Sequence, residues 1–526
     1  MRLSFACGAV AAGLMAGVSV APAVLSAQPG GVSAACSIDP NSPKELAILE
    51  LQVQRARGAQ APADRQSALR NIMKELDTKP ERFVKNPAGF NMRLVQALTM
   101  WAVEPGIGMT PARGSIGYVS NPGEPIDLVK SLDDSYKAIV AAIPACESEV
   151  ASLRQSDAWL AMTRRALDAS NGGEMDTAEI YAKRSLMLYA QSPYPHYVLA
   201  NVANQKKDRA AAMSEWKLVI QESGADTTYR ELRNSSLYLL SVNQLEAAES
   251  ATGAQKASLA REAANSFKSL LAATPDTPDA PNIMASWADA LKMAGDSASV
   301  PSIYADMLTK PDGYTDVALT MGGVIATQSN KSDDAIALFA AAAKKNPLAR
   351  DALRNLAATY YGKDQFQQMF APTQKLMEID PNNYDGWMML AYAGQGLAKA
   401  VKMPEVKKGV APTTAQRTAM EAAAADRKAW NDTTLKYMGI AEALPVKVDV
   451  SSFSRTAKDA SLTLQFQQMA EAAGTYNVTV EFVDLAGTVT GSATQSVGPL
   501  KKGESKSVSF KAPATNVAGY RYKPIK

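Results

Sequence analysis

The chain has 526 residues, of which 47% are hydrophobic and 20% are charged. This is an ordinary globular composition, which excludes low-complexity disorder and collagen-like repeats. Lys and Arg number 55 against 52 Asp and Glu, for a formal net charge of +3, so the charge gives no reason to expect nucleic acid or an acidic membrane as the main partner. The single histidine, His196, excludes any HExxH metal site and leaves one residue around which a Ser-His-Asp hydrolase could be built.

The first 27 residues have the pattern of a secretory signal peptide. Arg2 is their only charge, and the apolar stretch from Leu3 to Ala21 is followed by Pro22. This pattern predicts cleavage near Ala27 and a periplasmic or secreted protein. A retained membrane anchor is the alternative, but a run made mostly of Ala, Gly and Val partitions less strongly than a Leu-rich span. No other stretch could cross a bilayer, so we expect no transmembrane span after cleavage.

The chain has three cysteines, and Cys7 leaves with the signal peptide. Cys36 and Cys146 remain, and such a pair in an oxidising compartment is a candidate disulfide. The alternative makes Cys36 the lipid acceptor of a lipoprotein, because small residues precede it. Ser33 weakens this alternative, since it stands where such a signal usually carries Leu. The sequence therefore predicts a disulfide between Cys36 and Cys146, with lipoprotein anchoring at Cys36 as the minor alternative.

Residues 36–148 form a predicted N-terminal helical region. Ser42 and Pro43 are of types that favour the start of a helix, and further amphipathic stretches follow them. A loop from Pro105 to Pro125 separates these stretches from the next helix, because its glycines prevent regular helix. A loop of this length is either functional or a surface excursion, and the sequence leaves both readings open.

Residues 149–400 repeat a pattern of paired amphipathic helices. Pro347 and Pro381 lie 34 residues apart, and the segments before, between and after them keep one register. Small residues such as Gly323 let the two helices of a pair approach closely, while Phe339 and Trp387 fill the space between neighbouring pairs. Weaker units upstream are marked by Ala178, Ala212, Trp216, Ala263, Phe267, Trp287 and Tyr304.

These spacings resemble the tetratricopeptide repeat (TPR), a helix-turn-helix unit of 34 residues. The resemblance implies an α-solenoid whose concave face binds a protein or a peptide. The sequence departs from the repeat pattern in two places. One is an insertion near Glu246 to Lys256, and the other is a second helix in which Met369 replaces a small residue and Pro372 is present.

The same resemblance implies which residues line the groove, because the first helix of each TPR pair faces it. In this register the candidate partner-binding residues are Tyr194, Tyr197, Asn201, Asn204, Gln205, Asp351, Arg354 and Tyr361. Tyr and Arg are common binding anchors, and Asn can bond an extended backbone as donor and acceptor. Leu160, Thr163 and Leu167 take the equivalent face of the preceding unit, so capture of a C-terminal carboxylate by the clamp of some family members is not predicted.

The composition changes after residue 400. Residues 401–443 are interpreted as a basic, proline-containing linker and a long helix. From 444 to 526, apolar and polar residues alternate in five or more short segments, which predicts a small antiparallel β-sandwich that folds alone. The segment around Phe482 and Gly487 resembles the FxLYD-type extracytoplasmic domain, although Val483, Asp484 and Leu485 replace the usual Leu-Tyr-Asp.

The sequence contains no complete motif for catalysis. Ser214 and Lys217 have the SxxK spacing of serine acyl enzymes, but the chain has no KTG sequence. The segment from Asp380 to Asp385 lacks the glycine of a calcium loop, and no Walker A sequence is present. We therefore predict no catalytic residues, no cofactor and no metal site.

These patterns together predict a multidomain, mainly α protein. A TPR-like α-solenoid is expected between a helical N-terminal region and a small C-terminal antiparallel β-sandwich. The predicted function is a non-enzymatic protein-protein interaction scaffold of the bacterial cell envelope, with a protein or peptide ligand and no nucleic acid. The alternative is an envelope enzyme or carbohydrate-binding protein in which the repeats only position a separate site. The sequence leaves the partner and the oligomeric state open.

Overall fold

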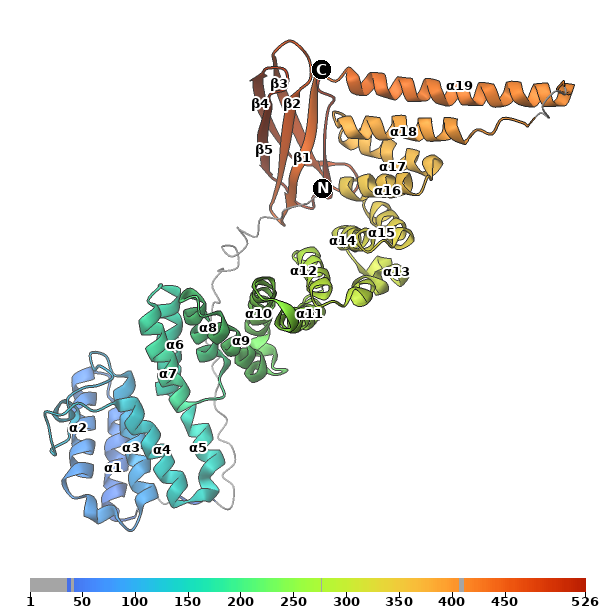
Figure 1. The fold of residues 1–526 in the computed structure, drawn as a ribbon. Coiled ribbons are helices and arrows are strands. Elements are labelled where there is room, and N and C mark those ends of the chain that lie inside the picture. Colours follow the sequence, from blue (N-terminus) through green and yellow to red (C-terminus); the bar gives the residue numbers. More distant parts are fainter. Residues whose placement is uncertain (1–35, 39–41, 276, 406–410) are drawn as a thin grey trace. The chain divides into compact units, whose positions relative to one another are not determined.

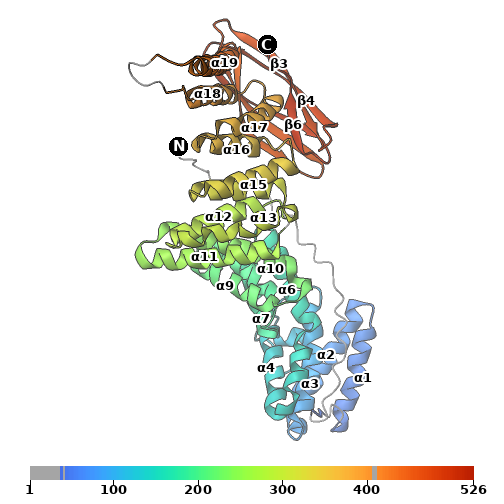
Figure 2. The same ribbon diagram turned by 90° about the vertical axis from the view of Figure 1, so that its right-hand side faces the viewer.

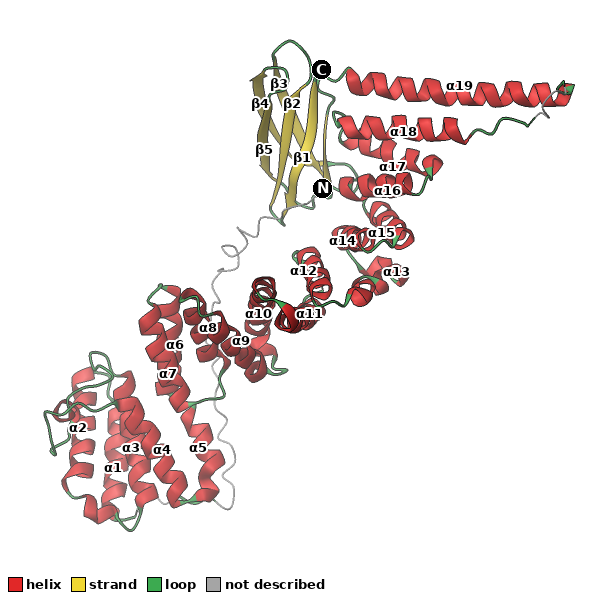
Figure 3. Ribbon diagram, in the orientation of Figure 1, coloured by secondary structure: helices red, strands yellow, loops and turns green. Residues whose placement is uncertain are grey.

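The computed structural model describes residues 36–38, 42–275, 277–405 and 411–526, and the predicted signal peptide lies outside them (Figure 1). The described chain is mainly helical and ends in antiparallel strands (Figure 3), so the predicted fold class is confirmed. It divides into two compact units, one up to Ser236 and one from Leu237 onward, and each is described by itself. Among the described residues, no helix combines the length and the apolar character that a membrane span needs.

The first unit begins with helices that pack around one apolar core. They are α1 (Lys44–Gly58), α2 (Pro62–Thr78), α3 (Pro87–Val103), α4 (Leu128–Ala142) and α5 (Glu147–Arg154), with the 3₁₀ turns η1 (Pro80–Phe83), η2 (Arg113–Ile116) and η3 (Pro144–Cys146). Trp101 on α3 and Tyr136 on α4 are buried in this core. The predicted disulfide between Cys36 and Cys146 is present, with a sequence separation of 110 residues. It joins the two ends of this helical region.

The start of α1 differs from the prediction. The helix begins at Lys44 after Pro43, and no side chain caps it. The carbonyl oxygen of Ser42 instead accepts a hydrogen bond from the side-chain amide of Asn86, whose own oxygen caps α3 at Gly89. Ser42 therefore connects the starts of two helices and does not cap its own.

The loop between α3 and α4 is fixed to α2. Arg113 donates hydrogen bonds to the carbonyl and hydroxyl oxygens of Ser120, and Asp77 on α2 accepts from the backbone and the hydroxyl group of Ser120. At Gly117, φ is +109° and a Cβ atom would lie 2.4 Å from the carbonyl oxygen of Arg70, so a side chain there would clash with the backbone of α2. The stretch from 113 to 120 therefore has a structural role.

Two helix pairs complete the first unit. They are α6 (Asp157–Asn171) with α7 (Met175–Leu188) and α8 (Pro193–Gln205) with α9 (Arg209–Ser223). Ala178 and Ala212, at equivalent positions of the two second helices, are fully buried, as close packing within each pair requires. The 3₁₀ turn η4 (Thr227–Tyr229) then leads to α10 (Arg230–Ser250), which crosses the boundary between the units.

The second unit continues the helix pairs. Its helical elements after α10 are α11 (Gly253–Ala273), α12 (Ala280–Met293), η5 (Ser297–Ile303), α13 (Ala305–Thr309), η6 (Pro311–Gly313), α14 (Asp316–Gln328), α15 (Ser332–Lys345), α16 (Arg350–Gly362), α17 (Phe366–Ile379), α18 (Tyr384–Ala400) and α19 (Thr414–Glu442). Gly323 on α14 has the expected role, because a Cβ atom there would lie 2.5 Å from the Phe339 ring of α15. Pro372 is tolerated inside α17, whereas the helix after α12 is split into η5 and α13, where Pro301 lies inside η5 and has no N–H to donate.

The C-terminal strands form two three-stranded antiparallel sheets. One sheet has the order β1 (Val446–Arg455), β2 (Asp459–Gln468), β5 (Ser505–Pro513), and the other has the order β4 (Val489–Leu500), β3 (Gly474–Val483), β6 (Gly519–Tyr522). Leu462, Leu464 and Phe466 on β2 are buried at every second position, as the period-two pattern predicts.

The sandwich shares its apolar core with the last helix pairs. Leu353 of α16, together with Leu376 and Ile379 of α17, belongs to the same buried cluster as Phe482 and Tyr522. Figure 2 shows β6 running beside α17, and the two elements are in contact. Helical side chains therefore fill part of the core of the sandwich. The prediction that the sandwich folds alone stays a prediction.

Polar contacts join the same surfaces. Asp380, which is fully buried in the turn between α17 and α18, accepts hydrogen bonds from Nε of Arg350 at 2.8 Å and from the hydroxyl group of Tyr522. Asn346, in the turn between α15 and α16, donates to the carbonyl oxygen of Ala518 at 2.9 Å. Asn346 and Asp380 are 34 residues apart, so two successive repeats use the same position to hold the C-terminal strand.

Candidate partner-binding face

The first helices of successive pairs lie against each other in each unit. In the second unit α14 contacts α16 and α16 contacts α18, and in the first unit α6 contacts α8. By the TPR resemblance, these helices supply the concave face. The predicted groove residues lie on α8 and on α16. These two helices belong to different compact units. The predicted groove residues therefore fall into two groups, one on each unit.

The predicted residues on α8 are partly engaged in packing within the chain. The half-buried residues are Tyr194, Tyr197 and Asn201, and the exposed ones are Asn204 and Gln205. The ring of Tyr194 packs edge to face on Tyr229, with the ring centroids 5.6 Å apart. Burial, and then the charge of Asp226, raises the pKa of Tyr194, so its hydroxyl group stays protonated near neutral pH. Tyr197 has no aromatic partner among the described residues, so its ring is more available than that of Tyr194 for contact with a partner protein.

Two polar residues, Thr163 on α6 and His196 on α8, have structural roles. Thr163 on α6 is buried, and its hydroxyl group lies 2.9 Å from the carbonyl oxygen of Trp159 and 2.7 Å from the hydroxyl oxygen of Ser185 on α7. The expectation that it lies on the groove face is wrong, because it bonds to its pair partner instead. His196 on α8 contacts Glu215 on α9, with Nδ1 and Oε2 2.7 Å apart. This contact connects the two helices of one pair.

The face of α16 and α18 carries an exposed group of aromatic rings. Tyr361, a predicted groove residue on α16, is 49% exposed, and Tyr392 on α18 is 43% exposed. Their ring centroids are 6.0 Å apart, and Phe366 at the start of α17 lies 6.1 Å from Tyr361. Gly396 on α18 permits this arrangement, because a Cβ atom there would lie 2.4 Å from the Phe366 ring. We call Tyr361, Phe366 and Tyr392 the aromatic patch.

Charged side chains of α16 lie on the same exposed helix surface as Tyr361. Arg354 precedes Tyr361 by two turns, is exposed, and forms no ion pair or hydrogen bond with any residue that the structure describes. Asp351 is also exposed, but it pairs with Arg350 at 3.1 Å. The predicted residues of α16 therefore offer one unpaired positive charge beside the aromatic patch.

The TPR register misses Phe366 and Tyr392. Phe366 opens a second helix, and the rule that first helices line the groove leaves such a residue out. Tyr384, Met388 and Tyr392 recur every four residues on α18 and are exposed or half-buried, so a helical stripe in the sequence could have indicated Tyr392. The contact between α16 and α18 that brings Tyr392 to Tyr361 depends on the tertiary structure.

Neither a catalytic centre nor a metal centre is evident in the part of the chain that the structure describes. Within residues 36–38, 42–275, 277–405 and 411–526, no group of three or more His, Cys, Asp or Glu side chains is placed to hold a metal ion. Ser214 and Lys217 lie on α9, a helix of a repeat pair.

The comparisons with known proteins give structural likeness only. No protein-family model matches the chain, and no curated protein matches it. Similar solved structures include a TPR protein from Thermus thermophilus (16% identity, 39% of this chain and 99% of that chain, TM-score 0.23), a TPR protein from Parabacteroides merdae (11%, 56% and 92%, 0.22) and the TPR domain of P58(IPK) (14%, 67% and 99%, 0.20). At these TM-scores they carry no argument, and the TPR-like fold rests on the helix pairs and their 34-residue register.

Proposed function

We propose that this protein is a non-enzymatic interaction protein of the bacterial cell envelope, and that it binds a segment of a partner protein on the aromatic patch. The exposure of Tyr361 and Tyr392 on neighbouring first helices carries the proposal. Single exposed apolar side chains are ordinary, but contiguous ones mark interaction surfaces. Tyr in particular supplies a large contact area with few rotatable bonds, which makes it a common binding anchor.

The charge beside the patch indicates the chemistry of the partner segment. Arg354 has a free guanidinium group two turns from Tyr361 on the same helix, and a guanidinium group pairs with a carboxylate through two parallel hydrogen bonds. The segment that fits best therefore carries an apolar or aromatic side chain for the patch and an acidic residue for Arg354.

The envelope location rests on two features of the N-terminal part. The first 27 residues have the pattern of a secretory signal. The disulfide between Cys36 and Cys146 is of a kind that persists in oxidising compartments and is rare in the cytosol.

Site-specific photo-crosslinking in the producing cells tests the proposal. A photoreactive amino acid at Ala358, an exposed position on α16 between Arg354 and Tyr361, should capture a specific protein. The double variant Tyr361→Ala, Tyr392→Ala should remove that crosslink. Leu435 on α19, which is 67% exposed, serves as the control position for general surface contacts.

The outcomes separate the two function classes. The same crosslinked proteins from Ala358 and from Leu435, with no effect of the double variant, would contradict a binding site at the patch. A glycan captured in place of a protein would favour the carbohydrate-binding alternative.

Affinity measurements with the captured partner then locate the contact. Arg354→Ala should weaken binding by about 1 to 3 kcal/mol, because a binding anchor is lost while the fold is kept. Tyr197→Ala tests the face of α8 in the same way. If only Tyr197→Ala weakens binding, the partner lies on the first unit and the aromatic patch is not its site.

A further inference from the structure

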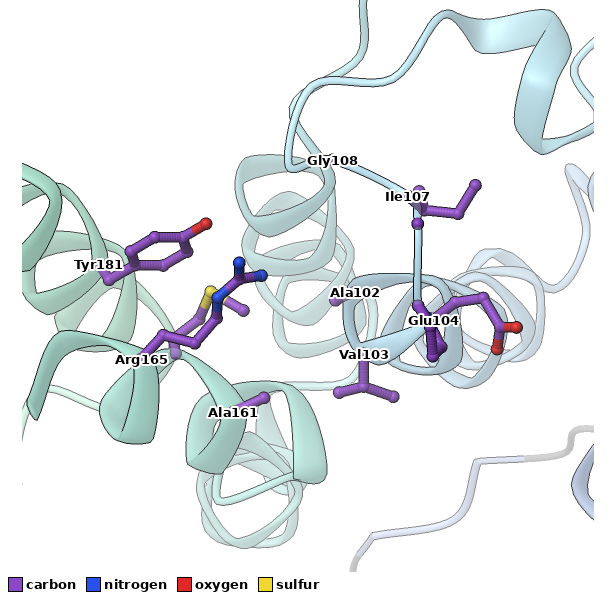
Figure 4. Close-up of a pocket in the computed structure, with 11 residues that line it drawn as sticks. Ala102, Val103, Glu104, Ile107, Gly108, Ala161, Arg165 and Tyr181 are labelled. Atoms are coloured by element: carbon purple, nitrogen blue, oxygen red, sulfur yellow. The ribbon is translucent and has the colours of Figure 1, made fainter. Parts of the chain in front are cut away.

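A cavity of about 490 Å³ lies in the first unit (Figure 4). Its walls come from the C-terminal end of α3, the loop Pro105–Gly108 that follows it, and the helices α6 and α7. This volume is within the range of small-molecule sites. The loop belongs to the Gly- and Pro-rich segment whose role the sequence leaves open. The stretch from 113 to 120 is structural, but residues 105 to 108 line the cavity.

One positive charge faces this cavity. The guanidinium group of Arg165 on α6 lies 4.8 Å from the centre of the Tyr181 ring on α7, and Figure 4 shows both side chains extending into the space toward Ala102 and Gly108. Arg165 forms no ion pair or hydrogen bond with any residue in the described ranges. Arg165 is an exposed residue. Its attraction to the face of the Tyr181 ring favours this position beside the cavity, and its N–H groups remain available to a ligand.

The one acidic residue of the lining does not neutralise Arg165. Glu104 is buried and receives two hydrogen bonds from Arg65, at 2.6 and 3.0 Å. Gln66 adds a third at 3.3 Å. In Figure 4 the Glu104 carboxylate points away from Arg165. The negative charge is thus already paired, and the cavity keeps one net positive charge.

The rest of the lining is apolar or has no side chain. Ala102, Ala161 and Met162 form the wall between α3 and α6, with Val103, which is 42% exposed, at its edge. Ile107 lies across the cavity from this wall. Met162 is fully buried and Ala102 is nearly so, and this wall therefore exposes little apolar surface. A short apolar part of a ligand would lie against Val103 and Ile107, where apolar atoms that leave water contribute to binding.

We infer that this cavity binds a carboxylate attached to a short apolar chain, with Arg165 pairing with the carboxylate and the Tyr181 hydroxyl group donating a further hydrogen bond. A single guanidinium group matches the two oxygens of one carboxylate. A phosphate would leave a second negative charge without a partner among the lining residues. The carboxylate can belong to a free acid or to the end of a peptide with an apolar last residue. The site is independent of the aromatic patch.

Titration of the mature, disulfide-bonded protein with three probes tests the inference. Hexanoate carries the free carboxylate and the apolar chain, hexanamide has the same chain without the charge, and N-acetyl-alanyl-leucine presents the carboxylate at a peptide end. Ligand-observed NMR should show saturable binding of hexanoate or of the peptide at concentrations up to about 10 mM. Binding of hexanamide should be at least about tenfold weaker, because a charge-assisted pair is lost. The probe that binds more tightly identifies the source of the carboxylate.

Two variants assign the binding to this cavity. Arg165→Gln should weaken the affinity for the carboxylate probe at least about tenfold. Arg164→Gln, at the adjacent position of α6, which is also exposed, should leave this affinity unchanged. Circular dichroism at equal concentration checks that both variants keep the helical fold. Equal binding of hexanoate and hexanamide, unaltered binding by Arg165→Gln, or no saturable binding of either carboxylate probe would each overturn the inference.

Discussion

The two ends of the described chain are stabilised in different ways. In the first unit, a covalent bond between Cys36 and Cys146 closes a segment with an ordinary apolar core. In the second unit, the β-sandwich is held by apolar packing and by buried polar groups centred on Asp380. A disulfide stabilises mainly by restricting the unfolded chain. A buried charge, in contrast, depends on each of its partners in the folded state.

This difference predicts where each unit is vulnerable. The first unit should be sensitive to reduction. The second unit should be indifferent to reduction, since both described cysteines lie in the first, and sensitive to the loss of single partners of Asp380. Four perturbations test this contrast.

The largest effect is expected from Arg350→Ala. The variant removes the guanidinium partner of Asp380, whose side chain is fully buried, and an unpaired buried charge costs about 3 to 5 kcal/mol of folding free energy. Hydrogen exchange measured by mass spectrometry should show faster exchange in β2 and β3 and no change in α2 and α3. Arg354→Ala, on the same helix but exposed, should change stability by less than about 0.5 kcal/mol. Equal effects of the two variants would show that Asp380 does not hold the sandwich.

Reduction of the disulfide is expected to destabilise the first unit by about 2 to 4 kcal/mol, because the reduced chain regains the freedom of a long loop. Chemical denaturation with and without a reductant measures this loss. The double variant Cys36→Ser, Cys146→Ser separates it from other effects of the reagent. If peptides from β2 and β3 also exchange faster on reduction, the two units do not unfold independently.

Tyr522→Phe should have an intermediate effect. Burial, and then the charge of Asp380, raises the pKa of Tyr522 well above its usual value, so the hydroxyl group stays protonated and donates to the carboxylate. Loss of one hydrogen bond to a charged group costs about 1.5 to 3 kcal/mol, and the ring still fills its place in the apolar cluster. The same exchange experiment should rank this variant between wild type and Arg350→Ala.

The smallest effect concerns an ion pair at the surface of the first unit. Hydrogen bonds from Lys183 and Lys206 lower the pKa of Glu179 to about 2, and the nitrogen atoms lie 2.6 and 2.7 Å from its carboxylate. Because the folded-state pKa is below the ordinary value of 4.5, this contribution is present above about pH 4.5 and is lost as the pH falls toward 2. Exposed pairs contribute at most about 1 kcal/mol.

The thermal midpoint of Glu179→Gln should therefore be slightly below that of wild type at pH 7. The two midpoints should converge as the pH falls to about 2. A constant difference across this range would mean that the charge of Glu179 is not the cause.

Much of the helical architecture is predictable from local pattern. The positions of Gly323, Phe339 and Pro347 predict the helix pairs, and their small and aromatic side chains meet in the structure as expected. The cysteine pair is predictable because only two cysteines lie beyond the predicted signal peptide. Thr163 does not lie on the predicted face, because its side chain is buried against Ser185 of the pair partner, a contact that helical spacing alone does not indicate. The eight candidate groove residues remain predictions on two separate surfaces.

Local sequence patterns predict the helices and strands of this protein, because helical and strand periodicity, small residues and prolines act over a few neighbouring positions. The way in which these elements combine depends on the tertiary structure. Asp380 and Tyr522 lie far apart in the chain, as do Tyr361 and Tyr392, and neither pair has a sequence signal of its own. The charge left free at Arg165 is also a tertiary result, since Glu104 could have paired with it but bonds to Arg65 instead. Such contacts depend on the approach of separate helices, which local patterns do not encode.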